Sequence, residues 1–198
     1  MKIKDNHLPP KVFKQLQDYV AKTDFKIIDI GAGRLISVLA APDFVIPHIQ
    51  IDGFELIVAF LRECYDGFDN TLNIHADNII ATTTYNDKKQ PVTVLNKVDH
   101  AGVLYVNNEE LVSENGTAFY FHSTHGYLLP ENVSEDEYNR LLIEDSNDET
   151  KWKQYEYVAS EPNRFLTYNA RLFHSKWPAN IDKGIRVVLV TFYKKKDA

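Results

Sequence analysis

The chain has 198 residues, of which 44% are hydrophobic and 25% are charged, and its formal net charge is −6 at pH 7. This length suffices for one substantial hydrophobic core, so we expect a single domain spanning residues 1–198. The acidic balance disfavours nucleic acid as a partner, because binding to phosphates depends on clustered Lys and Arg.

Cys64 is the single cysteine, which excludes an intramolecular disulfide and a cysteine-based zinc cluster. No run approaches the roughly 18 consecutive apolar residues of a membrane helix. The opening residues also lack the apolar core of a signal peptide. We therefore expect a cytoplasmic protein with no membrane segment.

The first third of the chain is expected to be a mixed, helix-containing support, residues 1–68. After Pro9 and Pro10, a helix is predicted over 11–22, because apolar side chains recur there at helical spacing. These side chains are Val12, Phe13, Leu16, Tyr19 and Val20. The apolar run Phe54–Cys64 is interpreted as a second helix.

From Thr71 the pattern changes to short runs rich in β-branched and aromatic residues, separated by turn residues such as those at 85–88 and 114–116. This pattern predicts a mainly β protein with flanking helices, with a barrel or jelly-roll core at about 70–193. The predicted strands lie within 71–85, 92–98, 101–107, 116–122, 164–169 and 185–193.

A polar insert, residues 131–153, interrupts the strands and is rich in Glu, Asp and Asn. We predict that it forms a short helix and a mobile loop. Because long polar loops on a rigid β scaffold commonly carry recognition, the insert is a candidate lid or specificity loop.

The candidate chemistry begins with His75 and Asp77. Residues two apart on a strand point to the same face, so both side chains can reach one ion. His174, near the far end of the strand region, is the candidate third ligand. Two histidines and one carboxylate form the facial triad associated with non-haem Fe(II) oxygenases, which leaves positions open for co-substrate and dioxygen.

Arg186 opens the last predicted strand, twelve positions after His174 (186 − 174). Its planar guanidinium suits bidentate capture of a carboxylate in a desolvated pocket. On its own an arginine at this position reads as a surface residue of an edge strand. The preceding candidate metal ligands favour the carboxylate-binding interpretation.

Four segments together resemble the 2-oxoglutarate/Fe(II)-dependent oxygenase superfamily, of the prolyl-hydroxylase-like kind. They are His75-Ala76-Asp77-Asn78, Gly102–Asn107 (GVLYVN), Asn115–Tyr120 (NGTAFY), and the stretch from Asn163-Arg164-Phe165 through His174 to Arg186. The resemblance covers about residues 70–193.

This resemblance implies a double-stranded β-helix, iron bound by His75, Asp77 and His174, and the C5 carboxylate of 2-oxoglutarate paired with Arg186. It also implies Fe(II), 2-oxoglutarate and dioxygen as cofactor and co-substrates, with ascorbate as an optional addition. The expected activity is a dioxygenase that hydroxylates a substrate and releases succinate and carbon dioxide.

The sequence departs from the family pattern at two places. The basic residue usually lies nearer ten positions after the distal histidine, so Lys183 is a second candidate for binding the co-substrate carboxylate. The tyrosine often found three residues before the first histidine is Leu72 here. Tyr105 is a candidate substitute for that hydroxyl, although a core aromatic is the more common role of such a residue.

Three further histidines have ordinary interpretations. His122 and His125 are separated by an odd interval, which on one strand points them to opposite faces, and we assign them surface or loop roles or the lining of the substrate mouth. His100 lies beside Asp99 and is compatible with either a pocket or a turn.

A rival interpretation begins at Phe25–Arg34, where Gly31 and Gly33 resemble the first motif of S-adenosylmethionine-dependent methyltransferases, with Asp52 as the ribose-binding acid. Leu35 stands where a third glycine is expected, and the later chain does not alternate strand and helix. A third possibility is a catalytically silent, metal-binding cupin-like module.

The sequence leaves the prime substrate open among an amino acid, a peptide or protein, and another small metabolite. The oligomeric state is open as well.

Overall fold

The computed structural model describes residues 1–31, 34–107, 115–181 and 184–196, and this part of the chain is mainly β-sheet with few helices. The helices are α1 (Pro10–Lys22) and α2 (Glu135–Arg140), with a π-helical turn at Leu141–Asp145 and 3-10 turns at Ile46–His48 and Glu149–Lys151. The strands are β1 (Lys2–Lys4), β2 (Lys26–Asp29), β3 (Leu35–Ala40), β4 (Phe54–Tyr65), β5 (Ile79–Tyr85), β6 (Pro91–Lys97), β7 (His100–Tyr105), β8 (Gly116–His122), β9 (Trp152–Ala159), β10 (Phe165–Asn169), β11 (His174–Trp177) and β12 (Ile185–Lys195). The predicted mainly β class is confirmed.

Seven strands of the described chain form one large sheet in the order β1-β10-β7-β12-β4-β3-β2. The last strand, β12, lies at its centre and pairs with β4 on one side and β7 on the other, antiparallel to both. Neighbours on this sheet therefore come from distant parts of the chain, so the candidate Arg186 on β12 lies next to the N-terminal third.

A smaller sheet has the order β11-β8-β9, again with antiparallel pairing. An isolated bridge between His75 and His174 joins the segment before β5 to the edge of this sheet. Gly116 begins β8 where β9 comes very close, since a Cβ there would lie 2.2 Å from the carbonyl oxygen of Val158. Only glycine allows this backbone approach.

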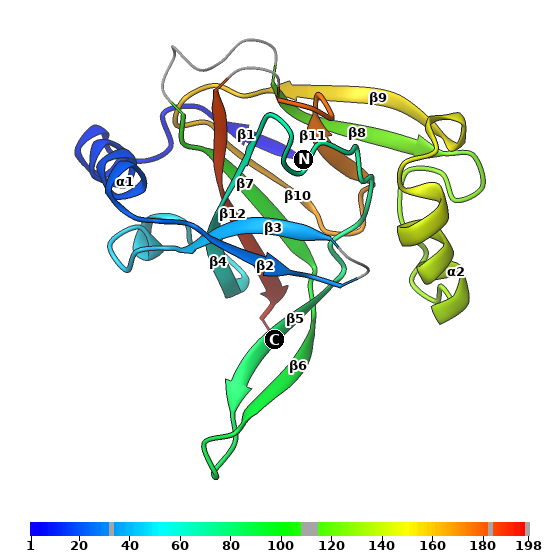
Figure 1. The fold of residues 1–198 in the computed structure, drawn as a ribbon, viewed down its shortest axis with the longest axis horizontal. Helices are drawn as coiled ribbons and strands as arrows, with labels where there is room; N and C mark the ends of the chain where they lie inside the picture. Colours follow the sequence, from blue (N-terminus) through cyan, green and yellow to red (C-terminus); the bar gives the residue numbers. More distant parts are fainter. Residues whose placement is uncertain (32–33, 108–114, 182–183, 197–198) are drawn as a thin grey trace.

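The third sheet is the hairpin of β5 and β6, which extends away from the two larger sheets (Figure 1). Its turn follows the predicted signal: the side chain of Asn86 accepts hydrogen bonds from the backbone N–H groups of Lys88 and Gln90. Leu95 and Tyr85 remain 72% and 70% exposed, so this hairpin adds little to the core.

Helix α1 confirms the first predicted helix. Pro10 occupies its first turn, where the missing N–H has no helical partner to lose. Leu16 is fully buried and belongs to the same cluster as Leu104 of β7 and Leu189 of β12. Burial of such a side chain contributes about 1.5–3 kcal/mol. The helix thus covers part of one face of the large sheet.

The predicted helix over Phe54–Cys64 is wrong, because these residues form strand β4. The apolar centre of this segment, Leu56–Leu61, fits a strand as well as a helix, so periodicity alone does not separate the two. As a strand between β12 and β3, it has both edges hydrogen-bonded. The correction brings Arg62 onto the large sheet beside Val188.

The insert contains the predicted short helix, α2, which begins at a cap: the side chain of Ser134 accepts a hydrogen bond from the N–H of Glu137. The last two residues of the insert, 152 and 153, belong to β9, a strand that the sequence interpretation did not include. No helix in the described residues has the length and apolar character needed to span a membrane.

Candidate metal centre and pocket

His75, Asp77 and His174 come together at one point. Mutual backbone hydrogen bonds of 3.0 and 2.9 Å between His75 and His174 place the two rings side by side, with centroids 4.6 Å apart. Asp77 lies two residues after His75, and its backbone N–H donates to the carbonyl of Ala170 at 2.7 Å. The ligand atoms of the three side chains all lie within 4.8 Å of one another.

Each imidazole is oriented by a backbone carbonyl. Nδ1 of His75 lies 2.7 Å from the carbonyl oxygen of Asn73, and Nδ1 of His174 lies 2.9 Å from that of Leu172. A carbonyl only accepts, so Nδ1 carries the hydrogen in both rings and Nε2 is the ring atom left to bind a metal. Such second partners fix the tautomer of metal-binding histidines.

The carboxylate of Asp77 lies between the two Nε2 atoms, at 3.4 Å from His75 and 3.1 Å from His174. Burial alone would raise the pKa of Asp77, but His174 and His75, in their protonated forms, hold it far below its usual range through their charges and hydrogen bonds. Burial and the neighbouring His174 lower the pKa of His75. A deprotonated carboxylate and a neutral imidazole are the forms that bind a metal ion.

Tyr168 of β10 is a member of this site that sequence reasoning missed. Its hydroxyl oxygen lies 2.9 Å from Nε2 of His174 and 3.4 Å from Oδ2 of Asp77. Burial, reinforced by the charge of Asp77, raises the pKa of Tyr168 well above its ordinary value, so the hydroxyl stays protonated and donates. No spacing or motif in the sequence marks this residue.

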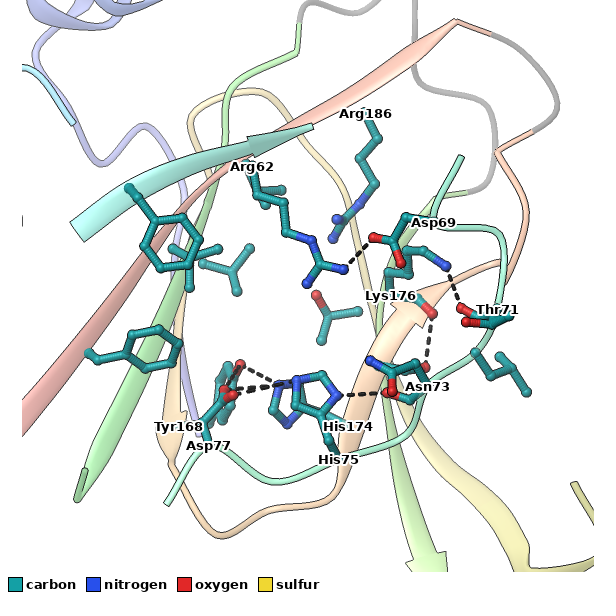
Figure 2. A pocket seen from close by; sticks show the side chains of 18 residues that line it. Arg62, Asp69, Thr71, Asn73, His75, Asp77, Tyr168, His174, Lys176 and Arg186 are labelled. Carbon is teal, nitrogen blue, oxygen red and sulfur yellow. Dashed lines mark hydrogen bonds and ion pairs between the residues drawn. The ribbon is translucent and has the colours of Figure 1, made fainter. Parts of the chain in front are cut away.

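The three ligands open into one pocket, shown in Figure 2. Apolar side chains from β4, β7 and β12 form part of the wall. The polar lining consists of Arg62, Asp69, Thr71, Asn73, His75, Asp77, Thr117, Tyr168, His174, Ser175, Lys176 and Arg186.

Arg186 is 6% exposed and lines this pocket, as the sequence interpretation requires. Its Nη2 donates to the carbonyl of Gly116 at 3.2 Å, while its buried Nε has no hydrogen-bond partner. Among the described residues no carboxylate pairs with it. A buried guanidinium without an acid is costly, so this position is suited to an anionic ligand.

Tyr105 is a fully buried core aromatic, packed beneath Arg186, whose guanidinium carbon lies 5.8 Å from the ring centroid. Its hydroxyl donates to Oγ1 of Thr117 at 2.8 Å instead of lining the pocket. Thr117 is the residue of this pair that faces the pocket. The other candidate for the co-substrate carboxylate, Lys183, lies outside the described residues.

Three more charged groups of the lining were missed, Arg62, Asp69 and Lys176. Arg62 forms an ion pair with Asp69, whose side chain is only 8% exposed. Lys176 donates to the carbonyl oxygens of Thr71, at 2.6 Å, and Ala179, and burial lowers its pKa to about 8. Lys176 could have been found, because it follows His174 by two residues on a strand and so shares its face.

His122 and His125 do not point to opposite faces, which corrects the prediction. Strand β8 ends at His122, and the turn that follows stacks the two rings with centroids 4.9 Å apart. His122 is 1% exposed, so it has no surface role, and neither histidine lines the pocket. His100 is half-buried against the ring of Phe54, with centroids 5.0 Å apart.

The strand arrangement does not support the methyltransferase interpretation. Strands β2 and β3 form an antiparallel hairpin through Gly31, whose φ is +100°, and β2 is exposed along its length. Every strand pairing in the described ranges is antiparallel, whereas a doubly wound nucleotide-binding sheet is mostly parallel. Gly33, the second glycine of that motif, lies outside the described residues.

No family model and no curated protein matches the sequence, but solved structures share its fold. The non-heme alpha ketoglutarate dependent carbocyclase SnoK from nogalamycin biosynthesis aligns with a TM-score of 0.65 and 12% identity over 98% of this chain and 79% of SnoK. HygX from Streptomyces hygroscopicus, solved with nickel, 2-oxoglutarate and hygromycin B, gives 0.54 and 13% over 98% and 82%.

The viral collagen prolyl hydroxylase vCPH from Paramecium Bursaria Chlorella virus-1, solved as a 2-oxoglutarate complex, aligns with a TM-score of 0.50 and 10% identity over 99% of this chain and 96% of vCPH. The chain therefore shares its fold with 2-oxoglutarate-dependent enzymes, as the sequence resemblance implied. The named reactions differ, a carbocyclisation and a prolyl hydroxylation, so the fold does not select one reaction.

Proposed function

We propose that this protein is a 2-oxoglutarate-dependent Fe(II) dioxygenase that hydroxylates a substrate and releases succinate and carbon dioxide. One observation carries the proposal. A cluster of two imidazoles and one carboxylate and a buried guanidinium without an acidic partner line the same pocket. The first group suits a divalent iron, and the second suits the carboxylate of a dicarboxylic acid.

We further propose that the two larger sheets form a double-stranded β-helix, or jelly roll, within a single domain of residues 1–198. In support, both sheets are antiparallel, and their order requires crossovers between strands that are distant in sequence. His174 lies on β11 of the small sheet and is bridged to His75, whereas Arg186 lies on β12 of the large sheet. The pocket thus lies between two sheets that hold its two ends independently.

In this proposal His75, Asp77 and His174 hold the iron on one face, and Asp77 supplies the only anionic protein ligand. The iron, when bound, supplies the activation of dioxygen by oxidative decarboxylation of 2-oxoglutarate. The chain itself contributes the fixed tautomers of the two imidazoles and the wall that limits water.

Arg186 is assigned to the distal carboxylate of 2-oxoglutarate, with Thr117 beside it as a hydroxyl donor. The strand register supports this arrangement, because the Arg186 guanidinium already donates to Gly116, the residue before Thr117. The apolar lining from Val103, Val188 and Phe192 suits the methylene groups between the two ends of the co-substrate.

The test is anaerobic reconstitution with Fe(II) and 2-oxoglutarate, followed by the visible metal-to-ligand charge-transfer band. We expect a band in the wild type, loss of the band in His174→Ala, and a much higher 2-oxoglutarate requirement in Arg186→Ala. Turnover is then measured as succinate released from 2-oxoglutarate in air.

Three outcomes separate the alternatives. A band with succinate release supports the dioxygenase. A band with no succinate under any condition favours a silent metal-binding module. Absence of a band in the wild type, together with binding of S-adenosylmethionine, would favour the methyltransferase interpretation.

The insert at 131–153 is proposed to shape substrate selection, because its residues contact the segment that carries the triad. The carbonyl of Ser146 accepts from the N–H of Ile74, and the side chain of Asn147 accepts from that of Asn73. Unchanged substrate selectivity after replacement of α2 by a short polar linker would contradict this role.

A further inference from the structure

The pocket contains more positive charge than the proposed iron and co-substrate require. In the described part of the chain its lining holds three cationic side chains and two carboxylates, Arg62, Lys176 and Arg186 against Asp69 and Asp77. The charges of a divalent iron and a dianionic 2-oxoglutarate cancel. Three minus two leaves one positive charge on the lining, which calls for another anion.

Once Arg186 is assigned to the co-substrate, the cations left on the lining are Arg62, which is paired with Asp69, and Lys176, which has no acid within ion-pair distance in the described chain. Arg62 pairs in register with Val188, two residues from Arg186 on the adjacent strand, so both guanidinium groups share the pocket face of the sheet. Figure 2 shows the two groups directed into the pocket on the same side of the triad. Arg186 lacks an acid, whereas Asp69 already holds Arg62.

Lys176 approaches from the opposite sheet. It pairs with Thr117 in register, and its ammonium donates to the carbonyls of Thr71 and Ala179. No carboxylate lies within ion-pair distance of it in the described ranges. Two carbonyl oxygens orient the group without neutralising it, so one N–H and the full charge remain for a ligand.

Arg34 adds to the same positive region from the tip of the β2–β3 hairpin. Burial lowers its pKa, and the neighbouring charge of Arg62 lowers it further, while Asp69 acts in the opposite direction. Arg34 is half-buried, and in the described chain no carboxylate lies within ion-pair distance of it. Cations that repel each other are stabilised when an anion binds between them.

We propose that the prime substrate carries an acidic group, a carboxylate or a phosphate, which binds to Arg62 and Lys176 beside the co-substrate. This inference rests on the proposed function and narrows its substrate class. Asp69 is the positioning residue that holds Arg62 toward the pocket. The two ligands then have different partners: 2-oxoglutarate binds to Arg186, the guanidinium without an acid, and the substrate binds to Arg62 from the same sheet and Lys176 from the facing sheet.

The experiment uses the full chain loaded with Zn(II) and 2-oxoglutarate, which prevents turnover and suits NMR. Inorganic phosphate and acetate are titrated separately at constant ionic strength, with acetamide as the uncharged probe. Arginine Nε–H and lysine Nζ–H resonances are followed by ¹⁵N NMR. We expect Arg62 and Lys176 to shift with at least one of the two anions and not with acetamide, and the stronger binder identifies carboxylate or phosphate.

Two variants locate the site. Lys176→Met keeps the apolar stem and removes the charge, and we expect anion affinity to fall about tenfold, the loss of one charge-assisted hydrogen bond. Lys194→Gln is the matched control, because it removes one positive charge from an exposed side chain paired with Glu55 and should change the affinity less than about twofold. Arg62→Gln combined with Asp69→Asn leaves the net charge unchanged and should weaken binding similarly, which provides a test if Lys176→Met does not fold.

The outcomes are distinguishable from failure of the proposed function. Absence of any anion-dependent shift at Arg62 and Lys176 in the wild type overturns the inference. It is also overturned if Lys176→Met weakens 2-oxoglutarate binding more than anion binding, because Lys176 then belongs to the co-substrate site. If the wild type binds no 2-oxoglutarate, the proposed function fails, and the titration of the zinc-loaded protein still tests the cationic cluster.

Discussion

Two pairs of neighbouring histidine rings lie in the described part of the chain, one tilted and one stacked, each beside acidic residues, and only one of them could hold a metal. The rings of His75 and His174 have centroids 4.6 Å apart, and those of His122 and His125 have centroids 4.9 Å apart. The first pair shares one carboxylate, Asp77. In the second pair each ring has its own acid, with His122 3.2 Å from Asp145 and His125 2.5 Å from Glu137.

The difference lies in what the acids already bind. Arg140 lies against both acids of the second cluster, at 2.5 Å from Glu137 and 3.6 Å from Asp145. These contacts fasten α2 and the following turn to the end of β8. Asp77 has no cationic lysine or arginine partner in the described ranges, and its cluster faces a pocket. A cluster of histidines and acids can therefore bind a metal only where the acids are not already paired with a cation. The residue types alone do not reveal this.

The largest effect is expected from Asp77→Ala, which removes the shared carboxylate. We expect Fe(II) affinity to fall about 100-fold or more, since changes in residues that merely support metal ligands already cause losses of 10–100-fold. Anaerobic equilibrium dialysis measures the change. Asp145→Ala is the matched control from the second cluster and should keep wild-type affinity, so equal losses in both variants would contradict the comparison.

Asp145→Asn is expected to lower the stability of the protein and to leave its Fe(II) affinity nearly unchanged. It removes the charged hydrogen-bond partner of a buried histidine, and such bonds contribute about 1.5–3 kcal/mol. The free energy of unfolding, measured by urea denaturation of the metal-free protein, should fall by about 2 kcal/mol. Fe(II) affinity should stay within about twofold of the wild type. A stability equal to that of the wild type would show that this cluster does not fasten the insert.

Sequence reasoning found the first cluster because its geometry is local. The spacing of two residues lets His75 and Asp77 share a face wherever this segment is extended. The predicted strand over 71–85 is only partly correct, because β5 begins at Ile79 and the two ligands are held before it by the His75–His174 bridge and by the bond from Asp77 N–H to Ala170. Reasoning failed for the second cluster because a turn begins where β8 ends, and strand alternation then no longer applies to His125. The run Phe54–Cys64 failed for another reason, since a strand that is buried between neighbours loses the polar alternation that would identify it.

The remaining site residues depend on pairing between distant strands. Arg186 was proposed from its residue type and its place after the candidate metal ligands, and the resemblance to a family supported the choice. Arg62 comes close to it because β4 pairs with β12, and Tyr168 reaches His174 from a strand with no motif. Such contacts are set by sheet order, which no local pattern determines. Thr117 was inside a recognised motif, but the motif does not show that it lines the pocket or that it accepts a hydrogen bond from Tyr105.

An effect of intermediate size is expected on the pH dependence of the free energy of unfolding. Burial, followed by the charge of His125, lowers the pKa of His122 below its ordinary value of 6.5. The unfolded chain therefore takes up a proton at this histidine at a higher pH than the folded chain does. Its contribution to stability is complete above about pH 6.5 and is lost as the pH falls toward the folded-state pKa.

His122→Gln should accordingly flatten the fall of stability below pH 6.5. One proton corresponds to at most about 1.4 kcal/mol per pH unit. Urea denaturation of the metal-free protein between pH 5 and 7.5 gives the slope for the variant and the wild type. An unchanged slope would mean that His122 takes up its proton equally in both states. His125→Gln is the comparison variant from the same stack.

The smallest effect is expected from Tyr168→Phe, which tests how far the first cluster depends on a neutral neighbour. The hydroxyl is near both Nε2 of His174 and Oδ2 of Asp77. Once Nε2 of His174 binds a metal, it can no longer accept a hydrogen bond. The Tyr168 hydroxyl then donates to Asp77 and orients that carboxylate. Fe(II) affinity should then fall by less than about tenfold, at or below the range for supporting residues. A rise in affinity would mean instead that the hydroxyl competes with the metal for His174, and dialysis against Fe(II) with Asp77→Ala as the reference separates the two cases.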